Sequence, residues 1–194
     1  MKKETKKTLL LALCALAVGA SMLLAASGGR AVKTDYYDTQ VKAAQQLQRC
    51  MERVKLYKQE LSIPLSPDEY FDTGMLGEQY NFITTSIGEL GAKRTSANPD
   101  MAALAVKMFH QAGLKKGDRI GAGFSGSFPC LNLAVICAAQ TMEIEIVPIT
   151  SVGASTYGAN NPQLSFPEML HMLYNDGLVN VDSVFVTLGG DYDT

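Results

Sequence analysis

The sequence has few of the residues from which common metal and redox sites are built. Among 194 residues there are two histidines, four cysteines and no tryptophan. No C-x-x-C and no H-E-x-x-H spacing occurs, which excludes the usual zinc and dithiol motifs. No G-x-x-x-x-G-K-[ST] is present, and no G-x-G-x-x-G follows a predicted strand, so neither a P-loop nor a dinucleotide fingerprint is indicated. We therefore expect no metal and no cofactor.

The cysteines do not indicate a disulfide framework. Cys130 and Cys137 are seven positions apart in one predicted helix, about 10 Å along its axis, which is too far for a bridge. Cys14 falls in an apolar run and Cys50 in a polar helix. We interpret the cysteines as small, buried apolar side chains.

An uncharged run, residues 9–26, follows four lysines at the amino terminus. As a helix, its 18 residues would span roughly 27 Å, close to the thickness of the hydrocarbon core. A cleaved signal peptide is the competing interpretation, because small residues follow the run at Ala25, Ala26 and Ser27. The run exceeds the usual length of a signal-peptide core, so we favour a retained, single-pass signal anchor. Leu13 before Cys14 excludes a lipoprotein signal.

The charge distribution predicts both the membrane orientation and the class of partner. The four lysines lie in the short segment before the apolar run. By the positive-inside rule they predict an amino terminus in the cytoplasm and residues after Arg30 outside the cell membrane. Residues 1–30 hold five of the 17 basic and one of the 19 acidic residues, which leaves residues 31–194 with a net charge of −6. Such an acidic surface argues against nucleic acid as a partner.

The pattern of apolar residues predicts an α/β fold. Residues 35–61 have helical periodicity and form either a stalk or a packing helix. From residue 98 onwards, strands and helices alternate, which is typical of a parallel sheet. The predicted strands are 118–124, 144–149 and 183–188; the predicted helices begin near Asn98–Pro99, Pro129 and Ser165–Pro167, and two of them end at Gly113 and Gly177.

We therefore predict a transmembrane helix followed by a Rossmann-like, three-layer α/β/α domain. The predicted divisions are a tail and anchor (1–30), a juxtamembrane amphipathic helix (31–62), a connecting segment (63–97) and a partial α/β domain (98–194). Because the sequence stops directly after a strand, without the covering helix that such a sheet requires, we expect a chain truncated at its carboxyl end.

Loops rich in glycine, serine and threonine follow each predicted strand. In a parallel sheet these loops share one rim, where free N–H groups at helix N-termini favour anions. A basic pair, Lys93–Arg94, lies among hydroxyl residues and suits a carboxylate or phosphate. The alternatives are that Ser127 only caps a helix and that the basic pair is a solvated surface pair. The candidate ligand-binding residues are Thr84, Thr85, Lys93, Arg94, Ser125, Gly126, Ser127, Ser151, Gly153, Ser155, Asn160, Gly189, Gly190 and Asp191.

A serine hydrolase is the alternative hypothesis. The stretch "GFSGS" is similar to the nucleophile elbow G-x-S-x-G, but Ser127 replaces its last glycine. A catalytic triad also needs a histidine, and His171, flanked by methionines in a predicted helix, is better interpreted as a packing residue. No complete catalytic motif is present, so the sequence leans against an enzyme.

Four stretches of the chain resemble the poly-gamma-glutamate system protein family. They are "TGMLGEQYNFITTSIGELGAKRTSANPD", "KKGDRIGAGFSGSFPCLNLA", "SVGASTYGANNP" and "GGDYD". The resemblance covers residues 70–193, with a matching anchor and helix in front, and members of the family continue past the end of this chain.

The resemblance implies a pathway. The family consists of membrane-anchored bacterial proteins associated with the machinery that makes and exports poly-γ-glutamate, and it has no assigned reaction. It implies an accessory role in capsule synthesis or export at the bacterial cell surface. The expected partners are other membrane proteins of that machinery, the polymer itself and the lipid bilayer.

Overall fold

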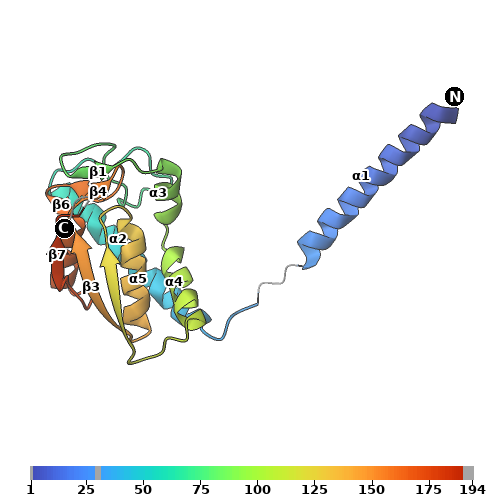
Figure 1. Cartoon of the computed structure of the whole chain (residues 1–194). Helices are drawn as coiled ribbons and strands as arrows, with labels where there is room; N and C mark the ends of the chain where they lie inside the picture. Colours follow the sequence, from blue (N-terminus) through green and yellow to red (C-terminus); the bar gives the residue numbers. More distant parts are fainter. Residues whose placement is uncertain (1, 29–31, 190–194) are drawn as a thin grey trace. The chain divides into compact units, whose positions relative to one another are not determined.

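The computed structural model describes residues 2–28 and 32–189, in two compact units, Met1–Asp35 and Tyr36–Thr194. The first unit contains helix α1 (Lys2–Gly28; Figure 1). Within it, Thr5–Leu24 has a mean hydropathy of 2.0. The prediction of an amino-terminal helix long and apolar enough to span a membrane is confirmed. A signal sequence would satisfy the same criteria.

The second unit contains the remaining helices and strands, and helix α2 (Tyr37–Glu60) is the longest of them. Along the chain there follow β1 (Thr84–Ser86), α3 (Leu90–Ser96), α4 (Asp100–Gln111), β2 (Arg119–Phe124), α5 (Pro129–Thr141), β3 (Glu145–Ser151), β4 (Ala154–Ser155), β5 (Asn160–Asn161), β6 (Leu164–Ser165), α6 (Phe166–Asn175) and β7 (Phe185–Thr187).

The central sheet is parallel, with strand order β2-β3-β7. Its register pairs Gly123 with Ile149 and Ile149 with Phe185. All three strands were predicted from the sequence, with boundaries that differ by up to two residues. Two small pairings, parallel β1-β4 and antiparallel β5-β6, were not predicted. Their strands have two or three residues, too short for a periodic pattern.

Helix α2 is a packing helix of the second unit. Its apolar face, which includes Leu47, Met51 and Val54, is buried against α4, α5 and α6. Of the two alternatives open for residues 35–61, a stalk and a packing helix, the structure therefore shows the second. The segment 63–97 also belongs to this compact unit.

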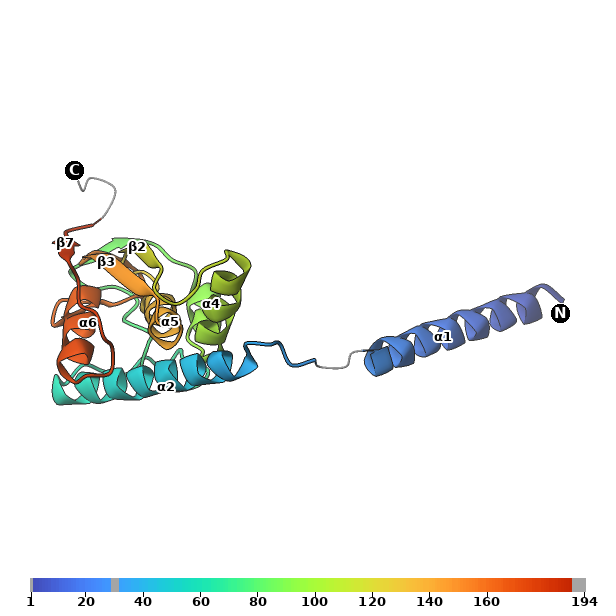
Figure 2. The same ribbon diagram turned by 90° about the horizontal axis from the view of Figure 1, so that it is seen from below.

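Helix α5 is apolar on nearly all sides because it lies between the sheet and α2 (Figure 2). Leu133, Ile136 and Cys137 are completely buried there, and Cys137 Sγ lies 3.9 Å from Cys50 Sγ on α2. The prediction of buried cysteines is confirmed for Cys50, Cys130 and Cys137. Burial raises the pKa of the Cys130 thiol to about 12, which keeps this thiol protonated and inert.

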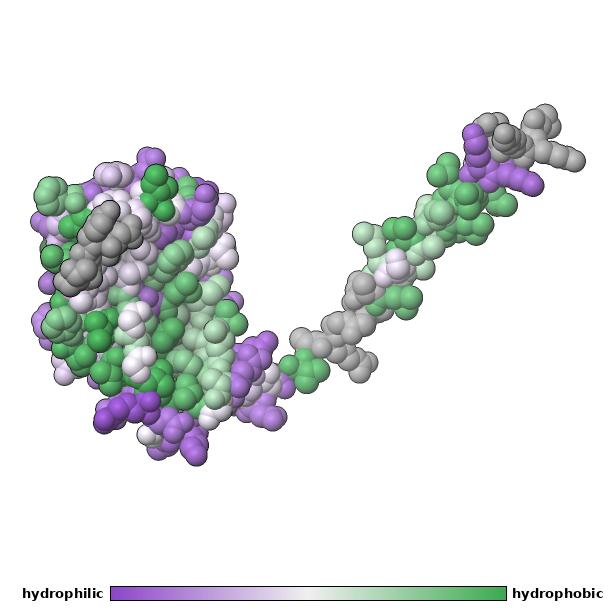
Figure 3. Space-filling view, in the orientation of Figure 1, coloured by the Kyte–Doolittle hydropathy of each residue, from purple (hydrophilic) through white to green (hydrophobic). Residues whose placement is uncertain are grey.

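The helices of the second unit cover one face of the central sheet (Figure 2). On the other face, Ile149 is 46% and Phe185 62% exposed, beside the exposed Gly121 and Gly123. Figure 3 shows this face, on which hydrophobic residues gather. Within residues 36–189 no helix covers it, so the described part of the chain has helices on one side of the sheet only and does not form the three layers that we predicted.

Candidate functional site

The loops that follow β2, β3 and β7 meet at one edge of the central sheet, which we call the rim (residues 125–128, 152–159 and 188–189). Gly126 N–H donates a hydrogen bond to Gly153 O (3.2 Å), and Gly153 N–H donates one to Leu188 O (2.8 Å). Gly126 O accepts a third from Ala159 N–H (2.8 Å). The structure therefore brings the three predicted loops together, as expected for parallel strands whose carboxyl ends share an edge.

Glycine at position 126 serves this close approach of the loops. A Cβ atom at Gly126 would lie 2.9 Å from the Ala154 Cβ and 3.2 Å from the Gly153 carbonyl oxygen. The sequence also has glycines at positions 121, 123 and 126, but Gly121 and Gly123 lie within β2. Only Gly126 is in the turn before α5, so the pattern is not a phosphate-binding turn of the dinucleotide type.

Lys93, on α3, is buried beneath the rim, and only 2% of the residue is exposed. Its Nζ donates hydrogen bonds to Ser155 Oγ (2.7 Å) and to the carbonyl oxygen of Ser127. The same nitrogen lies 3.8 Å from the centre of the Phe128 ring. Two rim loops and an aromatic ring thus surround the ammonium group. The basic pair Lys93–Arg94 in the sequence did not indicate this arrangement.

The charge of Lys93 has no carboxylate partner among the described residues. Desolvation by burial lowers its pKa to about 8, and no neighbouring carboxylate contributes to the shift. A cation in a site of low polarity favours losing its proton unless an anion compensates it. The buried lysine therefore has two chemical uses: as an ammonium group that attracts an anion, or, when neutral, as a base.

Arg94 points away from the rim. Its Nη2 lies 3.1 Å from Asp68 Oδ1, and its guanidinium carbon lies 4.7 Å from the centre of the Tyr70 ring. The prediction that Lys93 and Arg94 act as one basic pair is therefore wrong in geometry. Adjacent residues on a helix are about 100° apart around its axis and cannot face the same point.

The serines of the rim differ in their surroundings. Ser125 is exposed, and its Oγ accepts a bond from Ser127 N–H (3.3 Å). Ser127 does not cap α5, whose N-terminus has no side-chain cap. Instead, Ser127 Oγ accepts a bond from Ser155 N–H (3.1 Å), and Ser155 is only 5% exposed. Ser125 is therefore accessible, whereas Ser155 lies inside against Lys93.

Several other candidates hold the loops in place. Asn160 is completely buried, and its Nδ2 donates to Glu78 O (2.9 Å) and Thr84 Oγ1 (3.0 Å). Thr85 is exposed, and its Oγ1 donates to Ala154 O at 3.4 Å. Ser151 and Gly189 are half-buried and Gly153 is buried. Gly190 and Asp191 lie outside the described residues.

His171 is a surface residue, and the interpretation of it as a packing residue is wrong. Its Nδ1 lies 2.7 Å from Asp182 Oδ2, and its Nε2 lies 2.9 Å from Asn175 Nδ2. The carboxylate of Asp182 raises the pKa of the imidazole. Both ring nitrogens of His171 contact residues other than a serine, so the described residues do not form a Ser-His-Asp triad around it.

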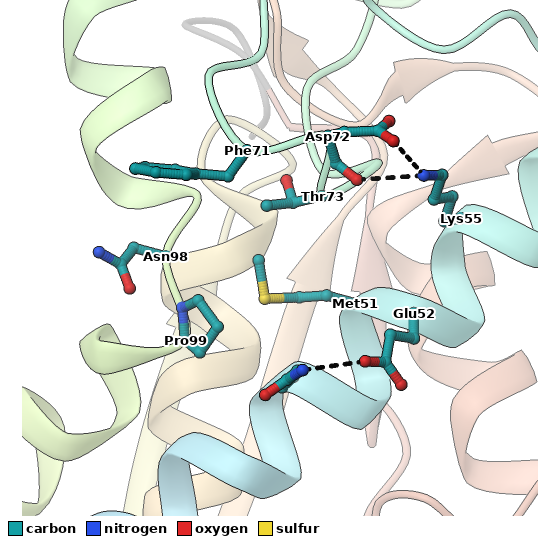
Figure 4. A pocket seen from close by; sticks show the side chains of 9 residues that line it. Met51, Glu52, Lys55, Phe71, Asp72, Thr73, Asn98 and Pro99 are labelled. Carbon is teal, nitrogen blue, oxygen red and sulfur yellow. Dashed lines mark hydrogen bonds and ion pairs between the residues drawn. The ribbon is translucent and has the colours of Figure 1, made fainter.

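A pocket of about 410 Å³ lies away from the rim, between α2 and the segments before α4 (Figure 4). Met51 forms part of its wall, with Phe71 and Pro99 across from it. Lys55 Nζ, on α2, bonds to the carboxylate and the carbonyl oxygen of Asp72. This hollow could not be predicted from local patterns, because its walls come from three separate segments.

No family model, curated protein or solved structure matches the chain.

Proposed function

We propose that the chain is a membrane-anchored accessory component of poly-γ-glutamate capsule synthesis or export. In this role, the rim would bind a carboxylate of a glutamyl chain or a phosphate. The pathway rests on the resemblance of residues 70–193 to the poly-gamma-glutamate system protein family. The binding role rests on one observation, the buried ammonium group of Lys93 without a carboxylate partner.

An anion at the rim would compensate the charge of Lys93. Ser127 contacts both groups: its carbonyl oxygen accepts a hydrogen bond from the Lys93 ammonium group, and its N–H donates one to Oγ of the exposed Ser125. The N-terminus of α5, 13 residues long, adds its dipole and free N–H groups next to Phe128. Hydroxyls, a helix N-terminus and a buried positive charge together favour a carboxylate or phosphate over a neutral ligand.

The fold proposal that accompanies this role is a Rossmann-like sheet. A parallel sheet whose strands end at a rim of polar loops supports it. In such a fold the exposed face that carries Ile149 and Phe185 would be covered by a second helical layer.

We expect the protein to stay in the membrane with its second unit outside the cell. Alkali extraction should leave it in the pellet at full mass, and protease added to spheroplasts should degrade the second unit. A Leu16→Arg variant should be released more readily, because an arginine at the helix centre costs about 2.5–3.5 kcal/mol on insertion scales. Release of the wild type at a reduced mass would show a cleaved signal peptide instead.

Binding can be measured by calorimetry on the full chain in nanodiscs of uncharged lipid, with short γ-glutamyl oligomers at low salt. We expect Lys93→Met to weaken binding roughly tenfold, since a unit charge near a protein surface contributes up to about 4 kcal/mol at 4 Å and less farther away. Ser125→Ala should weaken it less. Lys116→Met, which removes an exposed lysine, serves as the charge-matched control and should bind like the wild type.

The pH dependence gives a second check on the same ligand. Lys93 is protonated below its pKa of about 8 and neutral above it, so affinity should fall as the pH rises through 8. Salt should also weaken binding, because the Debye length is about 8 Å at physiological ionic strength. Equal affinities of the wild type and Lys93→Met, or no binding by the wild type, would remove the rim from the proposal.

The second candidate function is that of a serine hydrolase or transferase acting outside the membrane. It is favoured by one observation, the 2.7 Å contact between Lys93 Nζ and Ser155 Oγ.

A further inference from the structure

We propose that Ser155 is a nucleophile and Lys93 its general base, so that the two form a Ser–Lys pair for acyl transfer from an amide or ester. This activity goes beyond ligand binding and does not require it. A histidine-dependent triad motif does not reveal the pair, because a lysine replaces the histidine and 62 positions separate the two residues.

The geometry of the pair suits proton transfer. Lys93 Nζ and Ser155 Oγ are 2.7 Å apart, within the range of about 2.6–3.2 Å that connects a nucleophile to its base. Lys93 lies on α3, and Ser155 lies on β4, the two-residue strand within the rim loop 152–159 that pairs with β1. The reactive atoms are thus held at contact distance before any substrate binds.

A third group orients each partner. The carbonyl oxygen of Ser127 and the Phe128 ring hold the lysine nitrogen. The Ser127 hydroxyl accepts the backbone N–H of Ser155 and so fixes the segment that carries the nucleophile. Nucleophilic sites share two features: a base within hydrogen-bond distance of the nucleophile, and a neighbouring group that orients the base. The Ser125 hydroxyl contacts the N–H of Ser127 and no basic side chain among the described residues.

Lysine must be neutral to accept a proton, and its surroundings favour that state. Burial lowers its pKa to about 8, so that roughly a tenth of the molecules hold a neutral amine at pH 7. Charged and titratable groups on the elements packed around it do not oppose this. Arg94 is turned to Asp68, Glu89 is exposed, and the Cys130 thiol at the start of α5 stays protonated because burial raises its pKa to about 12.

A thin segment of backbone covers the serine. A Cβ atom at Gly88 would lie 2.8 Å from Ser155 Oγ and 3.0 Å from Lys93 Cε. Gly88 is held there by Thr156, whose Oγ1 accepts the Gly88 N–H (2.8 Å) and donates to the Gly88 carbonyl (3.1 Å). Its neighbour Ile87 is almost fully exposed. Displacement of the segment at Gly88 is the movement by which we expect a substrate to reach Ser155.

The reaction is balanced without an oxidant or a cofactor. As Ser155 Oγ forms a bond to the acyl carbon, its proton moves to the neutral amine of Lys93. When the bond from the acyl carbon to the leaving amine or alcohol breaks, the ammonium group of Lys93 returns the proton to that group. Water or an acceptor amine then attacks the acyl carbon and gives a proton to the neutral amine of Lys93; as the bond from the acyl carbon to Ser155 Oγ breaks, Lys93 returns that proton to Oγ, and the acid or the new amide leaves.

A fluorophosphonate probe on the full chain in detergent tests the proposal, because Ser155 Oγ would displace fluoride from phosphorus. Peptide mass spectrometry should locate the label on Ser155. The labelling rate should rise about tenfold per pH unit below pH 8 and level off above it, following the neutral fraction of Lys93. Ser155→Ala and Lys93→Arg should lower the rate at least 100-fold, whereas Lys116→Met, at an exposed lysine outside the rim, should leave it unchanged.

The wild type alone decides the question if the variants do not fold. Absence of label between pH 6 and 9.5, a label on Ser125, or a rate that does not change with pH would each overturn the proposal. The two functions fail separately. As the pH rises from 7 to 9, binding of γ-glutamyl oligomers should weaken in calorimetry, whereas labelling should become faster and then reach its plateau.

Discussion

Replacing Gly77 by alanine is expected to lower the free energy of unfolding by about 3 kcal/mol or more, the upper part of the range for overpacked sites. A Cβ atom at this position would lie 1.8 Å from the Gly158 carbonyl oxygen and 2.4 Å from Asn160 Oδ1. Gly77 N–H also donates to Tyr157 O (3.1 Å). The backbone cannot retreat without breaking this bond and the bonds of the buried Asn160, so the rim itself should loosen.

Gly91→Ala is the matched control for that variant. Gly91 lies in α3, and a Cβ atom there would meet nothing within 4 Å. Alanine has the higher helix propensity by about 1 kcal/mol, so this variant should be neutral or slightly more stable. Urea denaturation of the full chain in mild detergent measures both. Equal midpoints for Gly77→Ala and the wild type would show that the segment around Gly77 relaxes freely and that the close contact is not required.

The second large effect is a gain in stability as the pH rises from about 8 to 10.5, caused by a buried lysine. Lys58, on α2, is 5% exposed, and its Nζ donates a hydrogen bond to Leu76 O (2.6 Å). Burial lowers its pKa to about 8, although Glu69 and Glu78 partly oppose the shift. The ordinary value for lysine, which we assign to the unfolded chain, is 10.5.

The sign follows from proton binding. Between pH 8 and 10.5 the unfolded state binds more protons at Lys58 than the folded state, so folding becomes more favourable as the pH rises. Below pH 8 both states are charged and the folded state carries the whole penalty of the buried charge, on the order of 3 kcal/mol. Lys93 acts in the same direction. Tyr57 acts oppositely above pH 10, because burial raises its pKa and the unfolded chain loses that proton first.

Comparing the wild type with Lys58→Met isolates this contribution. The difference between their free energies of unfolding should change by about 3 kcal/mol between pH 7 and pH 10.5, in favour of the wild type at the higher pH. Lys55→Met is the control, because it also removes a lysine from α2. Lys55 Nζ pairs with Asp72 at the surface. If the difference between the wild type and Lys58→Met stayed constant with pH, the charge of Lys58 would not limit the stability of the fold.

The positions of the helices and of the main strands could be predicted from local patterns. Pro129 at the start of α5 and the left-handed Gly113 and Gly177 after α4 and α6 mark helix ends through their own backbone preferences. The placement of three polar loops on one rim also followed from the sequence, because strands joined by helices run parallel and share an edge. No such pattern distinguishes the two- and three-residue strands β1, β4, β5 and β6.

The candidate site could be predicted only as a group of residues. Lys93, Ser127 and Ser155 were all among the candidates, but their mutual contacts were not, because 34 positions separate Lys93 from Ser127 and 62 separate it from Ser155. Arg94 looked equivalent to Lys93 in the sequence. Because successive residues of α3 point in different directions, Lys93 lies inside and Arg94 contacts Asp68. The identities of neighbouring residues do not show which of them points inward.

The sequence by itself determined the properties that depend on neighbouring residues: an apolar helix of membrane-spanning length, the alternation of strands and helices, and the edge of the sheet at which the polar loops gather. Tertiary structure decided which side chains are dehydrated. Lys93 and Arg94 have the same charge in the sequence, yet only Lys93 is enclosed by the rim loops and loses its hydration. Burial depends on segments brought together from distant positions, and it is burial that lowers the pKa of Lys93 and places its nitrogen against Ser155.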